Sequence, residues 1–284
     1  AASQRGNNAQ AGFLSLKSAG YGFCPGRRRS GIGRDAFLLY PGHTGFGVVA
    51  MTIQNSVFYV GGSKGGVGKS LFSFALVDYL LNREANVLLV DTDTDNPDVY
   101  KAHSSLELPN LHCRMNSLDD ADGWADLLDM VQKFPEYAVV INAAARTKTS
   151  TNSYGEIMKA ALQDMARELC VFWIINRHRD SIELLHSFQE VFADVRIYVC
   201  RNLYFGEAQR FDLYNASKAR EAVERKGGTL DFPAVANRVA DWLYSRRMSL
   251  RAACAEMPFG TRAEVQRWRS LCASLFTQVL GENA

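Results

Sequence analysis

The sequence predicts an α/β protein, with a three-layer, doubly wound and mainly parallel sheet that forms a single domain. Two observations support this fold class. Short, continuously apolar runs alternate with helical patterns along residues 51–284, and such runs are typical of strands that are covered on both faces. A glycine-rich run over residues 61–70 separates the first apolar run from the first helical pattern. Alternating strands and helices indicate βαβ crossovers within one sheet.

The predicted elements follow one another in a regular order. Strands are expected at residues 56–60, 86–91, 137–141, 171–175 and 195–200. Helices are expected at residues 71–81, 119–133, 154–168, 181–192 and 262–280. Because ligands of such sheets bind beyond the carboxyl ends of the strands, the residues after each strand are the candidates for function.

The glycine-rich run after the first strand has the features of a phosphate-binding loop. Its glycines allow successive backbone N–H groups to point into one concavity at the start of a helix. Lys69 is expected to neutralise the β- and γ-phosphates of a nucleotide, and the Ser70 hydroxyl to ligate Mg²⁺. The nucleotide-binding residues are therefore predicted to be Lys64, Gly65, Gly66, Val67, Gly68, Lys69, Ser70 and Leu71.

The two lysines in Lys-Gly-Gly-Val-Gly-Lys-Ser, residues 64–70, give this loop an unusual form. It resembles the deviant Walker A motif of the ParA/MinD group of P-loop ATPases, and the resemblance extends over about residues 51–280. It implies ATP and Mg²⁺ as cofactors and a homodimer that closes on ATP. Lys69 would then act within its own subunit, and Lys64 would reach the phosphates of the partner as a catalytic residue.

Four carboxylates follow the second strand between Asp91 and Asp98, and they would repel one another without a cation nearby. The ParA/MinD resemblance implies that Asp93 orients the hydrolytic water and that Asp91 contacts the waters of the magnesium ion. The alternative is a solvated acidic turn that caps a helix at residues 96–98.

Asn142 follows the third predicted strand, at the position where the resembling family has the Walker B aspartate. An amide oxygen can still accept a hydrogen bond from a metal-bound water, but it brings no charge. We therefore count Asn142 with Ser70, Asp91 and Asp93 as candidate metal ligands, and expect weaker metal binding and slower hydrolysis.

Two asparagines after later strands are candidates for recognising the adenine base. The resemblance favours Asn202 over Asn176, because the family places an asparagine just past a late strand of the core. Either asparagine could instead cap a turn.

The C-terminal third, including residues 201–207, 211–220 and 232–234, resembles the TraL-type ATPases of conjugative plasmid transfer. Seven arginines against three acids between residues 238 and 269 could provide non-specific contacts to DNA, although solvated helix faces explain them equally well. The last helix has an apolar stripe, which is expected to pack on the sheet and not on a membrane.

Residues 1–50 differ in composition from the rest of the chain. They carry a net charge of +5, contain ten glycines and lack hydrophobic periodicity, whereas residues 51–284 sum to −3. We expect either a disordered basic extension or a mis-assigned start before Met51, and the ATPase domain at 51–284. Six scattered cysteines without a Cys-x-x-Cys pair are typical of a reducing compartment, so the cytoplasm is predicted.

These observations favour an ATP-hydrolysing molecular switch in plasmid partition or conjugative DNA transfer, with DNA or a transfer-apparatus protein as its partner. A nucleotide-gated binding protein with little hydrolysis is a second hypothesis, motivated by Asn142. A metabolic ATP-dependent ligase or amidase that shares the fold is a third, although the chain lacks a glutaminase-like nucleophile motif.

Overall fold

The computed structural model describes residues 52–62, 64–145 and 148–281, with the backbone alone at 148 and 149. The predicted extension over residues 1–50 and the predicted start at Met51 lie outside this range. The strands are β1 Ser56–Gly62, β2 Val87–Asp91, β3 Leu111–Met115, β4 Ala138–Asn142, β5 Glu168–Ile175, β6 Arg196–Asn202 and β7 Gly228–Phe232. The helices are α1 Lys69–Asn82, α2 Asp98–His103, α3 Ala121–Lys133, α4 Lys148–Asp164, α5 Arg179–Val191, α6 Asp212–Asn215, α7 Lys218–Val223, α8 Asn237–Arg246, α9 Leu250–Glu256 and α10 Phe259–Leu280.

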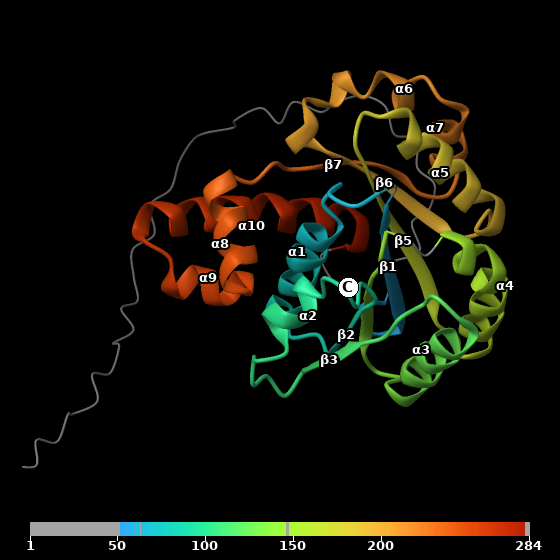
Figure 1. The fold of residues 1–284 in the computed structure, drawn as a ribbon, viewed down its shortest axis with the longest axis horizontal. Coiled ribbons are helices and arrows are strands. Elements are labelled where there is room, and N and C mark those ends of the chain that lie inside the picture. Colours follow the sequence, from blue (N-terminus) through green and yellow to red (C-terminus); the bar gives the residue numbers. More distant parts are fainter. Residues whose placement is uncertain (1–51, 63, 146–147, 282–284) are drawn as a thin grey trace, which may run out of the picture. The chain divides into compact units, whose positions relative to one another are not determined.

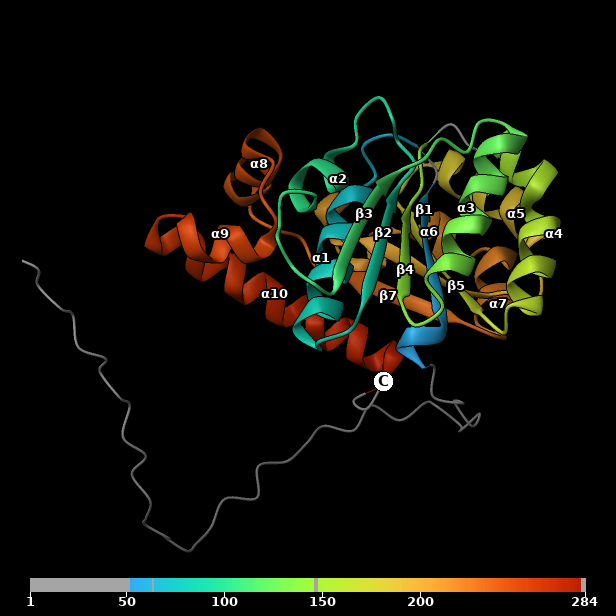
Figure 2. The same cartoon turned by 90° about the horizontal axis from the view of Figure 1, so that it is seen from below.

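Within the described residues, the strands form one sheet in the order β3-β2-β4-β1-β5-β6-β7, and every neighbouring pair is parallel. Helices α1, α2 and α8–α10 cover one face of the sheet, and α3–α7 cover the other (Figures 1 and 2). This arrangement confirms the predicted three-layer, doubly wound α/β fold.

The alternation of side chains along β1 shows how one strand supplies both cores. Phe58 and Val60 pack among the α1 and α10 side chains, whereas Val57 and Tyr59 pack toward α3, α4 and α5. All four are almost fully buried. A strand that is apolar at every position is therefore explained by burial on both faces.

Several predicted boundaries were wrong. The helix predicted at residues 154–168 starts earlier and ends at Asp164, because Ala166 has a left-handed backbone, with φ of 54°, and Glu168 already begins β5. The edge strands β3 and β7 were not predicted from the sequence. Both are partly exposed, so they lack the continuous apolar run that marked the central strands.

The strand register brings the carboxyl ends of the central strands together. Asp91 at the end of β2 pairs with Asn142 at the end of β4, and Asn142 pairs with Val60 of β1. The loop that follows β1 and the acidic run that follows β2 consequently lie at the same edge of the sheet.

At the other ends of the strands, Arg167 is buried immediately before β5. Its guanidinium donates hydrogen bonds of 2.5–3.5 Å to five backbone carbonyls, those of Asn55, Ser56, Phe134, Pro135 and Tyr137. Burial lowers the pKa of the guanidinium, which remains charged because its pKa starts so high. Arg167 thus joins the starts of β1, β4 and β5.

Candidate phosphate-binding site

The loop between β1 and α1 needs glycine at two positions. Gly66 and Gly68 have φ of 78° and 104°, in the left-handed region that side chains rarely adopt. A Cβ atom on Gly68 would also lie 2.4 Å from the side-chain nitrogen of Asn202. Glycine at position 68 therefore serves both the turn of the backbone and the close approach of β6.

Lys69 begins α1 and is held inside the loop, with 8% of its surface exposed. Its ammonium donates a 3.0 Å hydrogen bond to the backbone carbonyl of Lys64, across the curve of the loop. Burial lowers the pKa of Lys69, and the nearby Asp93 carboxylate opposes that shift. A cation so placed can neutralise an anion that is cradled by the loop.

Lys64, the other lysine of the motif, is exposed and forms an ion pair with Asp180 in the first turn of α5. The ammonium is thus held by a residue of α5 and not by the phosphate loop. The two lysines of the motif therefore have different environments, because Lys69 is buried within the loop and Lys64 is exposed.

Asp91 is completely buried at the end of β2. One of its oxygens accepts hydrogen bonds from the Asn142 amide at 2.9 Å and from the backbone N–H of Asp93 at 3.3 Å. The other accepts from the backbone N–H of Tyr100 at 3.0 Å. Burial raises the pKa of the Asp91 carboxyl, and these three hydrogen bonds oppose the rise.

The side chain of Asn142 is occupied at both ends and is 1% exposed. Its nitrogen donates to Asp91, and its oxygen accepts a 3.0 Å hydrogen bond from the hydroxyl of Ser73. Ser73 lies on α1, one turn beyond Ser70. Asn142 therefore links α1 to the end of β2, and its role toward a metal-bound water stays a prediction.

Asp93 is only partly buried and lies where its charge acts on Lys69. One of its carboxylate oxygens accepts a 3.1 Å hydrogen bond from the backbone N–H of Asn96. The acidic run thus forms a turn before α2, but no side chain caps the helix at Pro97, so the capping that the alternative predicted is not seen. The turn also holds the Asp93 carboxylate close to Lys69 of the phosphate loop, as a role in orienting the hydrolytic water would require.

The two candidate base-reading asparagines have different surroundings. Asn202 is 4% exposed, donates a 2.8 Å hydrogen bond to the carbonyl of Val67 in the phosphate loop, and accepts one from the backbone N–H of Tyr204. Asn176 accepts hydrogen bonds from the Ser181 hydroxyl and the His178 backbone at the start of α5. The structure brings Asn202, and not Asn176, to the phosphate loop.

Ser70 and Leu71 lie in the first turn of α1, and both are partly buried. The Leu71 side chain packs against the core on the α1 face of the sheet, so any contact from Leu71 to a phosphate would come from its backbone. Gly65 is exposed and Val67 is buried beneath the loop.

Three side chains at this edge were not predicted from the sequence, namely Ser73, Thr92 and Asp180. Thr92 donates to the Asn142 carbonyl at 3.1 Å and accepts from the backbone N–H of Ala144 at 2.9 Å, so it fixes the loop after β4. Asp180 could have been found, because it follows β5 at the same sheet edge as the other candidates.

A phosphate loop at the end of the central strand of a parallel, doubly wound sheet defines a P-loop nucleotide-binding protein. The chain belongs to the CobQ/CobB/MinD/ParA nucleotide-binding domain family, whose family model matches residues 58–205. This membership confirms the resemblance to ParA and MinD.

Two curated relatives extend the comparison. Protein MobD of Acidithiobacillus ferrooxidans is 45% identical over 231 residues, which are 81% of this chain and all of that protein. A protein TraL of Escherichia coli is 26% identical over 239 residues, 78% of this chain and 95% of that one. The predicted likeness of the C-terminal third to TraL-type proteins is thereby extended to most of the chain.

Among solved structures, a plasmid partition protein of Borrelia burgdorferi B31 bound to AMPPNP aligns with a TM-score of 0.50 and 14% identity, covering 78% of this chain and 98% of that one. This likeness supports the fold. In the described part of the chain, no helix is both long and apolar enough to cross a membrane.

Proposed function

We propose that this chain binds ATP with Mg²⁺ at the loop between β1 and α1 and works as an ATP-dependent dimeric switch in conjugative DNA transfer or plasmid partition. The observation that carries this proposal is the placement of the two lysines, with Lys69 buried inside the phosphate loop and Lys64 exposed at its edge. Lys69 would bind the phosphates of its own subunit, and Lys64 would exchange its exposed ion pair with Asp180 for the phosphates of a partner subunit.

The donor set fits a magnesium ion that arrives with the nucleotide. Among the described residues, no three His, Cys, Asp or Glu side chains are grouped as a ready-made metal site. Mg²⁺ commonly keeps several waters and binds through one or two carboxylates together with substrate phosphates. Ser70, Asp91 and Asp93 are the residues that would hold the ion or its waters, and the ion would supply charge neutralisation at the phosphates.

Hydrolysis requires a group that orients the attacking water, and Asp93 is the proposed one. Its carboxylate lies near Lys69 and is partly exposed, so a water molecule can reach it. Asp91 is less suited to this role, because it is completely buried and three hydrogen-bond donors already contact its oxygens.

A nucleotide-gated binding protein with little hydrolysis is the second candidate, and Asn142 is the observation that favours it. The neutral amide replaces a carboxylate at the end of β4, and both of its ends are used within the protein. The loss of one charge next to the metal would slow turnover without preventing nucleotide binding.

Helices α8 and α9 carry the proposed DNA-binding surface. Arg238, Arg246, Arg247 and Arg251 are exposed on α8, α9 and the turn between them. In contrast, Arg269 is engaged in a hydrogen-bonded ion pair with Asp78, and Arg267 in one with Glu264. The four exposed arginines are therefore the ones that we propose for phosphate contacts on DNA.

Two measurements on the whole chain test the switch. Light scattering with a non-hydrolysable ATP analogue should show a dimer that is absent without nucleotide. Steady-state ATP turnover should be slow and should rise when DNA is added. Dimerisation without turnover, even with DNA, would favour the nucleotide-gated reading, whereas neither dimerisation nor ATP binding would refute both.

A further inference from the structure

Asn202, the last residue of β6, is held at both ends of its side chain. Its nitrogen donates a 2.8 Å hydrogen bond to the backbone carbonyl of Val67 in the phosphate loop. Its oxygen accepts a 3.1 Å hydrogen bond from the backbone N–H of Tyr204 and so caps the 3₁₀ turn Leu203–Phe205. Asn202 therefore joins two loops at this edge of the sheet, although 135 positions in the chain separate it from Val67.

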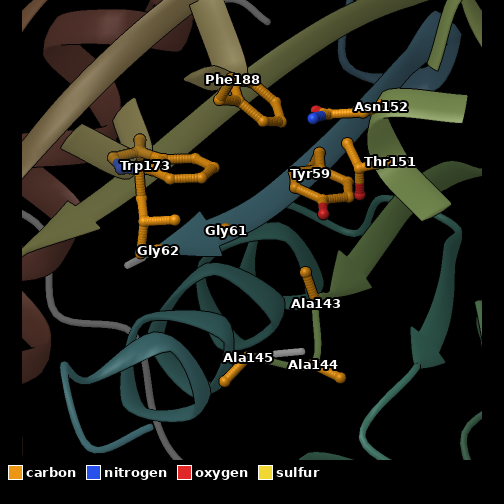
Figure 3. Close-up of a pocket in the computed structure, with 11 residues that line it drawn as sticks. Tyr59, Gly61, Gly62, Ala143, Ala144, Ala145, Thr151, Asn152, Trp173 and Phe188 are labelled. Atoms are coloured by element: carbon orange, nitrogen blue, oxygen red, sulfur yellow. The ribbon is translucent and has the colours of Figure 1, made fainter. Parts of the chain in front are cut away.

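The phosphate loop lies close over the ends of two strands before it reaches β6. In Figure 3, Gly62 lies at the tip of β1, where the loop begins. A Cβ atom on Gly62 would come within 3.0 Å of the Val67 side chain and 2.8 Å of the carbonyl oxygen of Ile174 on β5. Because β5 lies between β1 and β6 in the sheet, a loop folded down onto these strand ends brings Val67 to Asn202.

The hydrogen bond from Asn202 sets the direction of one peptide group in the loop. The carbonyl of Val67 and the N–H of Gly68 belong to the same peptide unit, which is trans, so they point in opposite directions. A phosphate loop turns its N–H groups inward toward the anion, and its carbonyls must then find donors on the outside. Asn202 is the donor for the Val67 carbonyl, and the Gly68 N–H is consequently directed away from Asn202.

The same contact supports the start of α1. The carbonyl of Gly68 accepts a 3.0 Å hydrogen bond from the backbone N–H of Phe72, and Lys69 is the first residue of the helix. The left-handed backbone of Gly68, with φ of 104°, packs directly against the Asn202 amide. A displacement of Asn202 would therefore be felt by the peptide group that precedes Lys69.

The oxygen of Asn202 is poorly placed to select a base. Adenine and guanine both present N7 as an acceptor, and they differ at position 6, where adenine has an amino group and guanine a carbonyl. An asparagine that selects adenine accepts a hydrogen bond from this amino group. The Asn202 oxygen already accepts from the backbone of Tyr204, and the side chain is 4% exposed.

We propose that Asn202 is a positioning residue for the phosphate loop and not the residue that selects adenine. It holds the Val67 carbonyl outward, so that the Gly68 N–H is turned toward the phosphates, and it does so whichever base the nucleotide carries. This inference rests on the proposed function, because it requires a nucleotide at the loop.

Asn202→Leu, which keeps the approximate size and removes both hydrogen bonds, tests the inference in the whole chain. Isothermal titration calorimetry measures the dissociation constants of ATP and of inosine triphosphate, which lacks the 6-amino group. Both should rise by about tenfold and by the same factor, because a loop that adopts its binding conformation less often binds proportionally more weakly. Asn176→Leu is the matched control and should change neither constant, since the Asn176 side chain accepts hydrogen bonds at the start of α5.

The dissociation constant separates positioning of the loop from a general effect on folding. A variant that only folds less completely would show fewer binding sites per chain with an unchanged dissociation constant. Asn202→Ser is a second variant, smaller and still polar, in case the leucine variant does not fold. It should also weaken the binding of both nucleotides by one common factor, because the shorter side chain leaves the Val67 carbonyl without its donor.

Three results would overturn the inference. The first is an unchanged dissociation constant for ATP in the Asn202 variants. The second is a loss of sites per chain without a change in that constant. The third is a loss of affinity that is smaller for inosine triphosphate than for ATP, because Asn202 would then contact the 6-amino group. An unaltered chain that binds neither nucleotide would instead refute the proposed function.

Discussion

The amide of Asn142 donates a 2.9 Å hydrogen bond to the buried carboxylate of Asp91. This contact joins the ends of β4 and β2 beside the phosphate loop, and it is possible because one of the two side chains is neutral. Two ionised carboxylates in these positions would repel each other strongly in the buried site.

Asn142→Asp should therefore destabilise the nucleotide-free protein by about 1–3 kcal/mol, because it replaces a buried donor with a second acid. The pKa of the new pair should be raised above the ordinary carboxyl range, so the folded state would hold an extra proton. The destabilisation should thus be smaller at pH 5 and larger at pH 8. Urea unfolding at both pH values measures it.

Asn110→Asp is the control for that variant, since the Asn110 amide also donates a hydrogen bond, but to the backbone carbonyl of Ala85 and in a partly buried position. If the loss of stability depends on pH equally in the two variants, the pairing of Asp91 with residue 142 is not the cause of that pH dependence.

Lys69→Met should abolish ATP binding, because the phosphate loop loses the cation buried inside it. Isothermal titration calorimetry measures the affinity directly. Lys101→Met, on α2, removes a lysine elsewhere in the chain and should bind ATP normally. Unchanged affinity in the Lys69 variant would show that the nucleotide binds elsewhere.

Asp180→Asn should favour ATP-dependent dimerisation, because it releases Lys64 from its ion pair within the same subunit. An exposed pair contributes at most about 1 kcal/mol, so the dimerisation constant should rise by up to about fivefold. Lys64→Met should retain ATP binding and lose the dimer. Sedimentation velocity with a non-hydrolysable analogue compares the three proteins, and a Lys64 variant that dimerises normally would rule out a role across the interface.

Asp93→Ala should lower ATP turnover by roughly 10²-fold or more while nucleotide binding persists, as expected for a group that positions the attacking water. Asp95→Ala, two residues further along the same turn, is the control and should retain most of the activity. Turnover is measured at saturating ATP across a magnesium titration. If both variants are equally active, Asp93 has no catalytic role.

His103, at the end of α2, should make the fold sensitive to mild acid. It is fully buried, and burial lowers its pKa from 6.5 to about 4. The folded state thus favours the neutral ring, and its stability should fall as the pH drops from 6.5 toward 4, by about 3 kcal/mol in total.

His103→Gln should remove most of that pH dependence, whereas His186→Gln should leave it unchanged, because His186 is exposed. Thermal unfolding between pH 4 and pH 7 distinguishes them. A wild-type Tm that is flat over this range would contradict the buried neutral state of His103.

The sequence by itself determined the central strands, the phosphate loop and the family. These features are local, because an apolar run such as residues 87–90 reports burial on both faces, and a loop such as 64–70 carries its function in consecutive residues. The edge strands β3 and β7 escaped prediction for the same reason, since partial exposure removes the continuous apolar signal.

Only the tertiary structure decided which distant side chains meet. The pairing of Asn142 with Asp91 and Ser73, the ion pair of Lys64 with Asp180, and the contact of Asn202 with Val67 all join residues separated by 51 to 135 positions in the chain. The order and register of the strands create these contacts, and neither is encoded in any one segment. The Thr151 hydroxyl is a further case, because its lack of a hydrogen-bond partner among the described residues is visible only in the folded structure.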